Sequence, residues 1–178
     1  MARRTFNWDK INEQIKATVI KSSGSFEPID DTISHPAKLV GLTFCGEEES
    51  TFNGETKIKN NMIMIFALGK DKPRVFSTKV AISSHEKSKL MKYLSGWGKE
   101  FKDLGPSLID QDALLFFENK DGKDRDGNPR VYTNLTRVAK PKDEYTLSED
   151  VYAPKWIVGK YGETNIACGE RLLIPELD

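Results

Sequence analysis

The chain has 178 residues, and its 27 lysine and arginine residues balance 27 aspartate and glutamate residues, so it has no formal net charge. Apolar residues make up 38% and charged residues 30%, which excludes a uniformly basic, histone-like protein and an acidic tail protein but allows one modest core. No apolar run approaches the ~18 residues of a membrane span, so we expect a soluble protein.

The chain has three segments of different character. Apolar residues recur every four positions between Trp8 and Ile20 and predict a short helix, after which glycines and prolines interrupt any regular element. We therefore expect an N-terminal extension over 1–36, a patterned domain over 37–141 and a C-terminal extension over 142–178. The C-terminal extension either wraps the core or reaches a partner.

Three strands begin the patterned domain. Lys38–Cys45 and Arg74–Ile82 alternate apolar with polar residues, and Asn61–Leu68 is a continuous apolar run of strand length. Residues 46–60 are expected to form a loop between the first two strands. The alternation in the first strand predicts one shared face for Val40, Leu42 and Phe44.

A helix is predicted after the third strand. Ser83 and Glu86 have the spacing of a capping box, with Ser83 as the N-cap. We expect the helix to end or loosen at Gly96 and Gly98, with Trp97 closing the core. Its apolar residues recur at spacings of four, three and four: Leu90, Leu94, Trp97 and Phe101.

Two further strands, Ala113–Glu118 and Val131–Val138, follow, joined by a loop over 119–130 with the turn sequence Asp126-Gly127. The fold class is therefore mainly β: a five-stranded Greek-key OB barrel has its helix between strands three and four. Long loops after the first and fourth strands strengthen this prediction, because such loops flank the binding face of OB folds. The alternative is an unrelated small α+β sheet.

Charge is distributed unevenly along the chain. Lys57–Lys102 contains 11 basic and 3 acidic residues and so carries +8, whereas 141–178 has 4 basic and 8 acidic residues, which gives −4. The helix lysines Lys87, Lys89 and Lys92 also fit a solvated helix face. Basic residues on or beside the second and third strands could line one groove for a polyanion: Lys57, Lys59, Lys70, Lys72, Arg74 and Lys79.

We expect no enzyme, no cofactor and no metal. The chain has no phosphate-binding glycine loop, and its two histidines and two cysteines form no metal or disulfide motif. Asp121–Gly127 resembles a calcium loop, but counting Gly127 as position six places Gly122 and Thr133 where carboxylates are required, so a charged hairpin loop is expected. Cys45 follows an apolar strand and fits a buried hydrophobe better than a nucleophile.

Aromatic residues lie among these basic residues. Phe116 and Phe117 are adjacent, so one of them points away from the core unless an extension covers it. Exposed rings on a basic OB face stack bases while cations neutralise the backbone of single-stranded nucleic acid. Alternatively, the two extensions cover this face and the rings belong to the core. The candidate nucleic-acid-binding residues are Lys57, Lys59, Phe66, Lys72, Arg74, Lys79, Phe116, Lys123, Arg125, Tyr132 and Asn134.

Residues 38–138 resemble a family of small bacteriophage replication-region proteins. The string H-E-K-S-K-L at His85–Leu90, followed by Trp97, is the most specific part, and Tyr132–Leu135 is similar to the last strand of the family. Ile109–Asp112 departs from the Gly-x-Pro turn that is common there. The resemblance implies an OB-fold, single-stranded-DNA-binding-like protein in the cytoplasm of a bacterial host.

Together these patterns predict a non-catalytic protein that binds single-stranded DNA without sequence specificity during phage DNA replication or recombination. The alternative is an OB-fold protein-interaction module, such as a replisome adaptor or an inhibitor of a host factor, that binds no nucleic acid. Other replication or recombination proteins and further copies of the chain stay open as partners, and no membrane partner is expected.

Overall fold

The computed structural model describes residues 28–177, so the helix predicted over 8–20 lies outside the described residues. The chain divides into two compact units, a larger main unit and a smaller arm unit. Residues 31–118 and 134–177 form the main unit, and residues 119–133 together with residues 28–30 belong to the arm unit.

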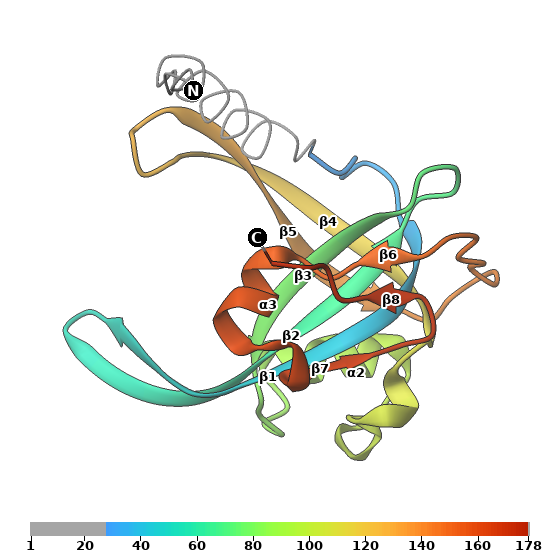
Figure 1. The fold of residues 1–178 in the computed structure, drawn as a ribbon. Coiled ribbons are helices and arrows are strands. Elements are labelled where there is room, and N and C mark those ends of the chain that lie inside the picture. Colours follow the sequence, from blue (N-terminus) through green and yellow to red (C-terminus); the bar gives the residue numbers. More distant parts are fainter. Residues whose placement is uncertain (1–27, 178) are drawn as a thin grey trace, which may run out of the picture. The chain divides into compact units, whose positions relative to one another are not determined.

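Five strands form the central sheet (Figure 1). They pair in the order β3-β2-β1-β4-β5, and helix α2 (Lys89–Trp97) follows β3 in the chain. The predicted order of three strands, a helix and two strands is therefore confirmed. Within residues 28–177, no strand pairing joins the edge strands β3 and β5. The strands are β1 (His35–Phe52), β2 (Glu55–Leu68), β3 (Arg74–Ala81), β4 (Asp112–Lys123) and β5 (Pro129–Ala139).

The connections that the sequence predicts as loops, 46–60 and 119–130, are largely strand. β1 and β2 stay paired as far as the turn at Asn53 and Gly54, whose φ angles are 52° and 78°. Two successive positive φ angles are typical of a type I′ hairpin turn, which Asn-Gly favours. The prediction of loops is therefore wrong for most of both connections. The sequence did not indicate strands because both faces of such a two-stranded ribbon carry polar residues, so apolar residues do not alternate with polar ones.

Two β-bulges in β1 change which of its side chains face the core. The register against β2 shifts twice, and each shift leaves one extra residue in β1, Val40 and then Cys45. Val40 packs on the outer face of the sheet, whereas Leu42 lies opposite Met64 on the inner face. The prediction that Val40, Leu42 and Phe44 share a face is therefore wrong, because a bulge interrupts the alternation.

The inner core lies between the sheet and α2. Phe66 is fully buried, and its ring centroid lies 6.3 Å from that of Trp97. Trp97 is 2% exposed and donates its indole N–H to the carbonyl oxygen of Asp112 at 2.7 Å. Tyr93 donates its hydroxyl to the carbonyl oxygen of Leu135, and burial raises the pKa of Tyr93 to about 12. The predicted core position of Trp97 is confirmed.

Helix α2 begins later than the sequence predicts. Ser88 is the N-cap, and its hydroxyl oxygen accepts a hydrogen bond from the Met91 amide at 3.2 Å. The predicted cap at Ser83 is wrong, because that hydroxyl accepts from an amide within the turn before the helix. Gly98 ends the helix with a φ of 76°, as expected, so Phe101 lies beyond it. Two 3₁₀ turns then lead to β4: η1 (Phe101–Asp103) and η2 (Pro106–Leu108).

The C-terminal region, residues 142–177, packs onto the outer face of the sheet, as the first of the two alternatives above expects. β7 pairs antiparallel with β1, and β6 pairs in parallel with β8. Its elements are β6 (Val151–Tyr152), α3 (Lys155–Tyr161), η3 (Glu163–Asn165), β7 (Ile166–Cys168) and β8 (Leu172–Leu173). The outer cluster joins Val40, Ile63, Ile65 and Ala67 of the sheet to Tyr145, Leu147, Val151, Ala153, Ile157, Val158, Ile166 and Leu172.

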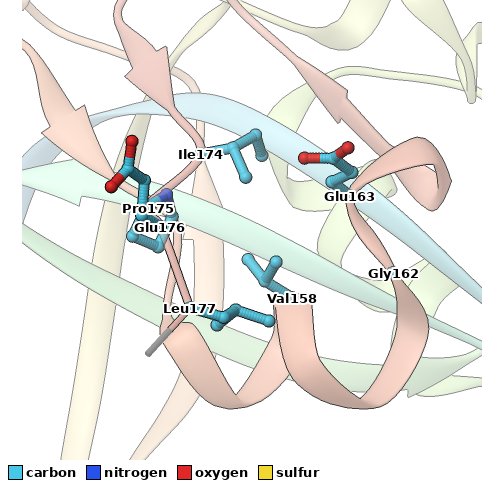
Figure 2. Close-up of a pocket in the computed structure, with 7 residues that line it drawn as sticks. All are labelled: Val158, Gly162, Glu163, Ile174, Pro175, Glu176 and Leu177. Atoms are coloured by element: carbon cyan, nitrogen blue, oxygen red, sulfur yellow. The ribbon is translucent and has the colours of Figure 1, made fainter.

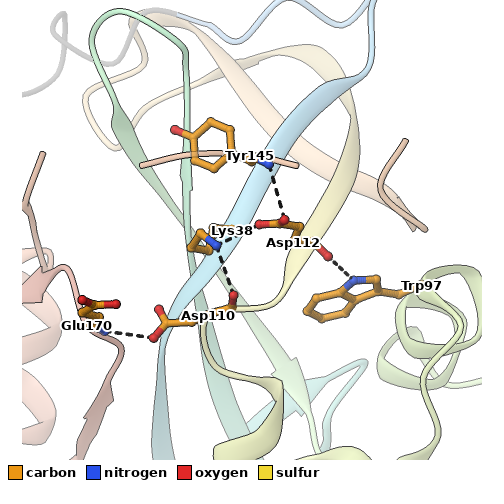
Figure 3. Close-up of polar contacts among 6 residues, drawn as sticks. All are labelled: Lys38, Trp97, Asp110, Asp112, Tyr145 and Glu170. Atoms are coloured by element: carbon orange, nitrogen blue, oxygen red, sulfur yellow. Dashed lines mark hydrogen bonds and ion pairs between the residues drawn. The ribbon is translucent and has the colours of Figure 1, made fainter. Parts of the chain in front are cut away.

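A polar network also attaches the C-terminal region to β1 and β4 (Figure 3). The Lys38 ammonium donates to Asp112 Oδ1 at 2.9 Å and to the carbonyl oxygen of Asp110 at 3.2 Å. The other carboxylate oxygen of Asp112 accepts from the Tyr145 amide at 3.4 Å. Asp110 Oδ2 accepts from the Glu170 amide at 3.0 Å. Two carboxylates therefore hold the C-terminal chain at two separate points.

Candidate nucleic-acid interface

The predicted basic residues of β2 and β3 do not gather in one groove. Strand alternation and register place Lys57, Lys59 and Lys79 on the outer face of the sheet. Arg74 belongs to the set of β3 residues on the other face and is half-buried. Lys72 is exposed in the turn between the two strands. Only three of these residues therefore share a face.

Phe66 is not available to stack on a base. It is 0% exposed and packs against Trp97 in the inner core. Its neighbours Ile65 and Ala67 point the other way and are buried in the outer cluster, so both faces of this part of β2 are covered. The prediction of Phe66 as a stacking residue is wrong, because a run that is apolar on both faces does not indicate which side is exposed.

Lys79 binds groups of its own chain. Its ammonium donates to Glu48 Oε2 at 3.1 Å and to the Tyr161 hydroxyl oxygen at 2.8 Å. The Tyr161 hydroxyl donates to Glu48 Oε2 at 3.0 Å, and Asn61 Nδ2 donates to Glu48 Oε1 at 3.1 Å. Lys160 Nζ lies 3.7 Å from the same carboxylate. These five residues form the Glu48 cluster, which joins α3 to the sheet.

The Glu48 cluster is held together by charge. The hydrogen bond from Lys79 is the main reason that the pKa of the Glu48 carboxyl falls to about 2, and bonds from Asn61 and Tyr161 add to the effect. Burial opposes the charge on Lys79, but its hydrogen bonds to Tyr161 and Glu48 raise its pKa overall. Lys79 therefore has a structural role in place of the predicted phosphate contact.

The β1–β2 hairpin presents the remaining cations of the outer face. Lys57 and Lys59 are exposed and line a small hollow of about 170 Å³ together with Ser50 and Glu55. The sequence predicts both lysines as binding residues. The four residues that line the hollow all belong to β1 and β2, and none of them comes from the C-terminal region.

The opposite face of this hairpin exposes apolar side chains that the sequence analysis missed. Phe44 is 46% exposed and Ile58 is 63% exposed. Phe44 lies opposite Met62, and Met62 shares a face with Ile58 because side chains four apart in one strand point the same way. Phe44 keeps the regular alternation with Leu42, but alternation alone does not indicate that this part of the face meets solvent.

In the arm unit, the structure places one candidate ring, Tyr132, against the backbone of another candidate, Lys123. Tyr132 is 38% exposed, and its hydroxyl donates to the carbonyl oxygen of Lys123 at 2.7 Å. The Arg130 guanidinium lies 5.1 Å from the ring centroid. The sequence analysis did not identify Arg130 as a candidate. The ring packs so closely over Gly122 that an added Cβ would lie 2.7 Å from it. Lys123 and Arg125 are exposed on the same hairpin.

The turn of the arm is formed by Asp124. Its Oδ1 accepts hydrogen bonds from the amides of Asp126 and Asn128, both at 2.9 Å. An aspartate that bonds to amides two and four residues ahead stabilises a tight turn. This segment is therefore the charged hairpin turn that the sequence predicts.

The two adjacent phenylalanines of β4 face opposite ways, as predicted. Phe117 is 5% exposed, and its ring lies 4.9 Å from that of Phe76. Phe116 is half-buried, with the Arg137 guanidinium 5.0 Å from its ring centroid. Phe116 is thus the outward ring of the pair, covered in part by an arginine. Asn134 is exposed on β5.

Among residues 28–177, no three His, Cys, Asp or Glu side chains lie together as a metal site, and no helix is long and apolar enough to cross a membrane. The chain matches no family model, and comparisons with curated proteins and with solved structures give no match. The function therefore has to be inferred from the fold and from the surfaces of the two hairpins.

Proposed function

We propose that the protein binds single-stranded DNA without sequence specificity, as a non-catalytic OB-fold protein of phage DNA replication or recombination. The strand order and the position of α2 in the chain support an OB barrel, in which β3 and β5 would close the sheet. In OB folds the connections after strands one and four flank the ligand. Here both connections are long hairpins with exposed cations, and this observation is the main support for the proposal.

The arm hairpin offers a ring together with cations. Tyr132 and Arg130 form a cation–π pair, and both groups have planar surfaces on which a base of any identity stacks. Lys123 and Arg125 are exposed on the same hairpin and would neutralise phosphates. None of these contacts distinguishes one base from another, so binding without sequence specificity follows.

The β1–β2 hairpin offers a short row of cations. Lys57 and Lys59 stand two residues apart on one face of β2, a spacing of about 7 Å along the strand. Such a row follows the backbone of an extended single strand and adds to affinity through release of counterions. The neighbouring carboxylate of Glu55 limits the positive potential of this hollow.

The part of the outer face of β2 and β3 that lies beneath the C-terminal region is not part of the proposed site. The outer cluster buries its apolar residues beneath the C-terminal region, and Glu48 neutralises Lys79. Binding through the hairpins therefore predicts that lysines of the β1–β2 hairpin affect DNA affinity and that Lys79 does not.

The test is a titration of fluorescein-labelled oligo-dT by fluorescence anisotropy over a range of salt concentrations. We expect affinity to fall with salt, with a slope of about −0.7 for each phosphate contacted. Replacing Lys57 and Lys59 together with alanine should flatten this slope by about 1.4. The control, Lys87→Ala with Lys92→Ala, removes two exposed lysines near α2 and should leave the slope unchanged. Absence of binding at low salt would overturn the proposal.

A protein-interaction module is the second candidate function. The C-terminal region exposes two aromatic side chains, Tyr152 at 60% and Trp156 at 54%. Aromatic residues are enriched in protein interfaces. A protein that acts only in this way should show no salt-dependent binding of oligo-dT, so the same titration separates the two candidates.

A further inference from the structure

A hollow lies at the end of α3 in the main unit, and Figure 2 shows the side chains that line it. Its volume is about 500 Å³. Val158 and Glu163 line it from α3 and the turn that follows, while Ile174, Glu176 and Leu177 line it from the segment after β8. In Figure 2 the apolar side chains lie between the two carboxylates. We call this feature the acidic hollow.

The floor of the acidic hollow is supported by the outer cluster. Helix α3 ends at Gly162, whose φ is 86° and whose amide donates to the Val158 carbonyl oxygen at 2.9 Å. Val158 and its neighbour Ile157 are buried in the outer cluster, and Ile174 packs against it. The hollow therefore lies over packed side chains and not over a loose loop, which gives a ligand a preformed surface.

The charge of the acidic hollow has one sign. Among residues 28–177, those that line it include two carboxylates and no cationic side chain. Two cations nearby in the sequence bind carboxylates outside the hollow: Lys160 Nζ lies 3.7 Å from Glu48, and Arg171 Nη1 lies 3.5 Å from Asp150. A ligand that complements this hollow needs positive charge.

Exposed apolar side chains accompany these carboxylates. Leu177 is 53% exposed. A second hollow of about 760 Å³ shares Ile174 and Glu176 with the first, and the cation Lys155 also lines it. Its lining includes two further apolar side chains, Tyr152 and Leu173. These two side chains are 60% and 39% exposed. Neighbouring exposed apolar side chains with a polar rim are typical of surfaces that bind other proteins.

We propose that the acidic hollow docks a short segment of a partner protein in which an aliphatic residue stands beside lysine or arginine. The aliphatic side chain and the methylene stem of the basic residue pack on Val158 and Leu177, while the cationic head binds Glu163 and Glu176. The same carboxylates repel nucleic acid and acidic segments. The acidic hollow shares no residue with the set proposed to bind DNA, so the two functions can be tested by separate substitutions.

The test measures binding of the full chain to a fluorescein-labelled peptide of alternating leucine and lysine, by fluorescence anisotropy. A peptide with glutamate in place of lysine serves as the charge control. We expect the lysine peptide alone to bind. The double variant Glu163→Gln with Glu176→Gln should weaken its binding by about tenfold, a change of about 1.4 kcal/mol. Leu177→Ser should also weaken it, although it alters no charge.

The matched control variant is Glu149→Gln with Glu170→Gln, which removes two exposed carboxylates of the same region that do not line the hollow. It should bind the peptide as the unaltered protein does. Equal weakening in both double variants would overturn the proposal, because the peptide would then follow overall charge. Self-association of the protein that Leu177→Ser abolishes would overturn it as well, since the occupant would be a second copy of the chain.

Discussion

The ammonium of Lys79 lies 2.8 Å from the hydroxyl oxygen of Tyr161, which stands 82 residues further along the chain. Both groups also bind the carboxylate of Glu48. Through these bonds α3 is fastened over the outer face of the sheet. A lysine that the sequence suggests as a DNA contact thus helps to keep that face covered.

Replacing Lys79 with alanine should therefore affect stability and not DNA binding. We expect the free energy of unfolding to fall by about 1 kcal/mol, since the Lys79 side chain is partly exposed to solvent. The slope of oligo-dT affinity against salt should stay the same, whereas Lys59→Ala should flatten it by about 0.7. Urea unfolding and the anisotropy titration measure the two effects. If Lys79→Ala and Lys59→Ala flatten the salt slope equally, Lys79 contacts DNA and this prediction is wrong.

The stability supplied by Glu48 should depend on pH. Its pKa is about 2 in the folded protein against an ordinary value of 4.5, so the unfolded chain binds this proton more tightly. The contribution is therefore complete above about pH 5 and is lost as the pH falls towards 2. Glu48→Gln should lower the free energy of unfolding by about 1–2 kcal/mol at neutral pH.

The measurement is denaturant unfolding of both proteins over a series of pH values. The difference between them should shrink as the pH falls and disappear near pH 2, where Glu48 becomes protonated in the folded state as well. A difference that stays constant over the whole range would mean that the charge of Glu48 is not what stabilises the fold.

Two helical glycines differ in their surroundings and allow a matched test of the packing of α2. A Cβ at Gly96 would lie 2.2 Å from the carbonyl oxygen of Val138 in β5, whereas a Cβ at Gly159 would meet nothing within 4 Å. Gly96→Ala should cost about 1–3 kcal/mol, as overpacking does. Gly159→Ala should be neutral or stabilise by up to about 1 kcal/mol. Thermal unfolding compares them, and equal melting temperatures would contradict the close approach of α2 to β5.

The parts of the fold with a clear period could be predicted from the sequence. The apolar run before Leu68 and the alternation that begins at Arg74 identify two strands, and the spacing of apolar residues up to Trp97 identifies the helix. The protruding hairpins have no such period, because both of their faces meet solvent. The bulges at Val40 and Cys45 also give no local signal, since they depend on pairing with β2.

The candidate site could be predicted only in part, for a related reason. Lys59 and Tyr132 are exposed as expected because they stand on hairpins, where solvent is the default neighbour. The partner of Lys79 is Tyr161, and the cover over the outer face comes from a segment without a clear pattern. Contacts between residues so far apart in the chain depend on tertiary packing, which periodicity does not report.

Stacking is tested by comparing two rings, one exposed and one buried. Tyr132→Ala removes an exposed ring and should weaken oligo-dT binding by roughly tenfold or more with a nearly unchanged salt slope, since one stacked base is worth about 1–3 kcal/mol. Tyr132→Phe keeps the ring and loses only the hydrogen bond to Lys123, so it should bind almost as the unaltered protein does. Phe66→Ala should lower the free energy of unfolding by about 3–5 kcal/mol and leave affinity unchanged well below its melting temperature. Full affinity in Tyr132→Ala would show that bases do not stack on the arm.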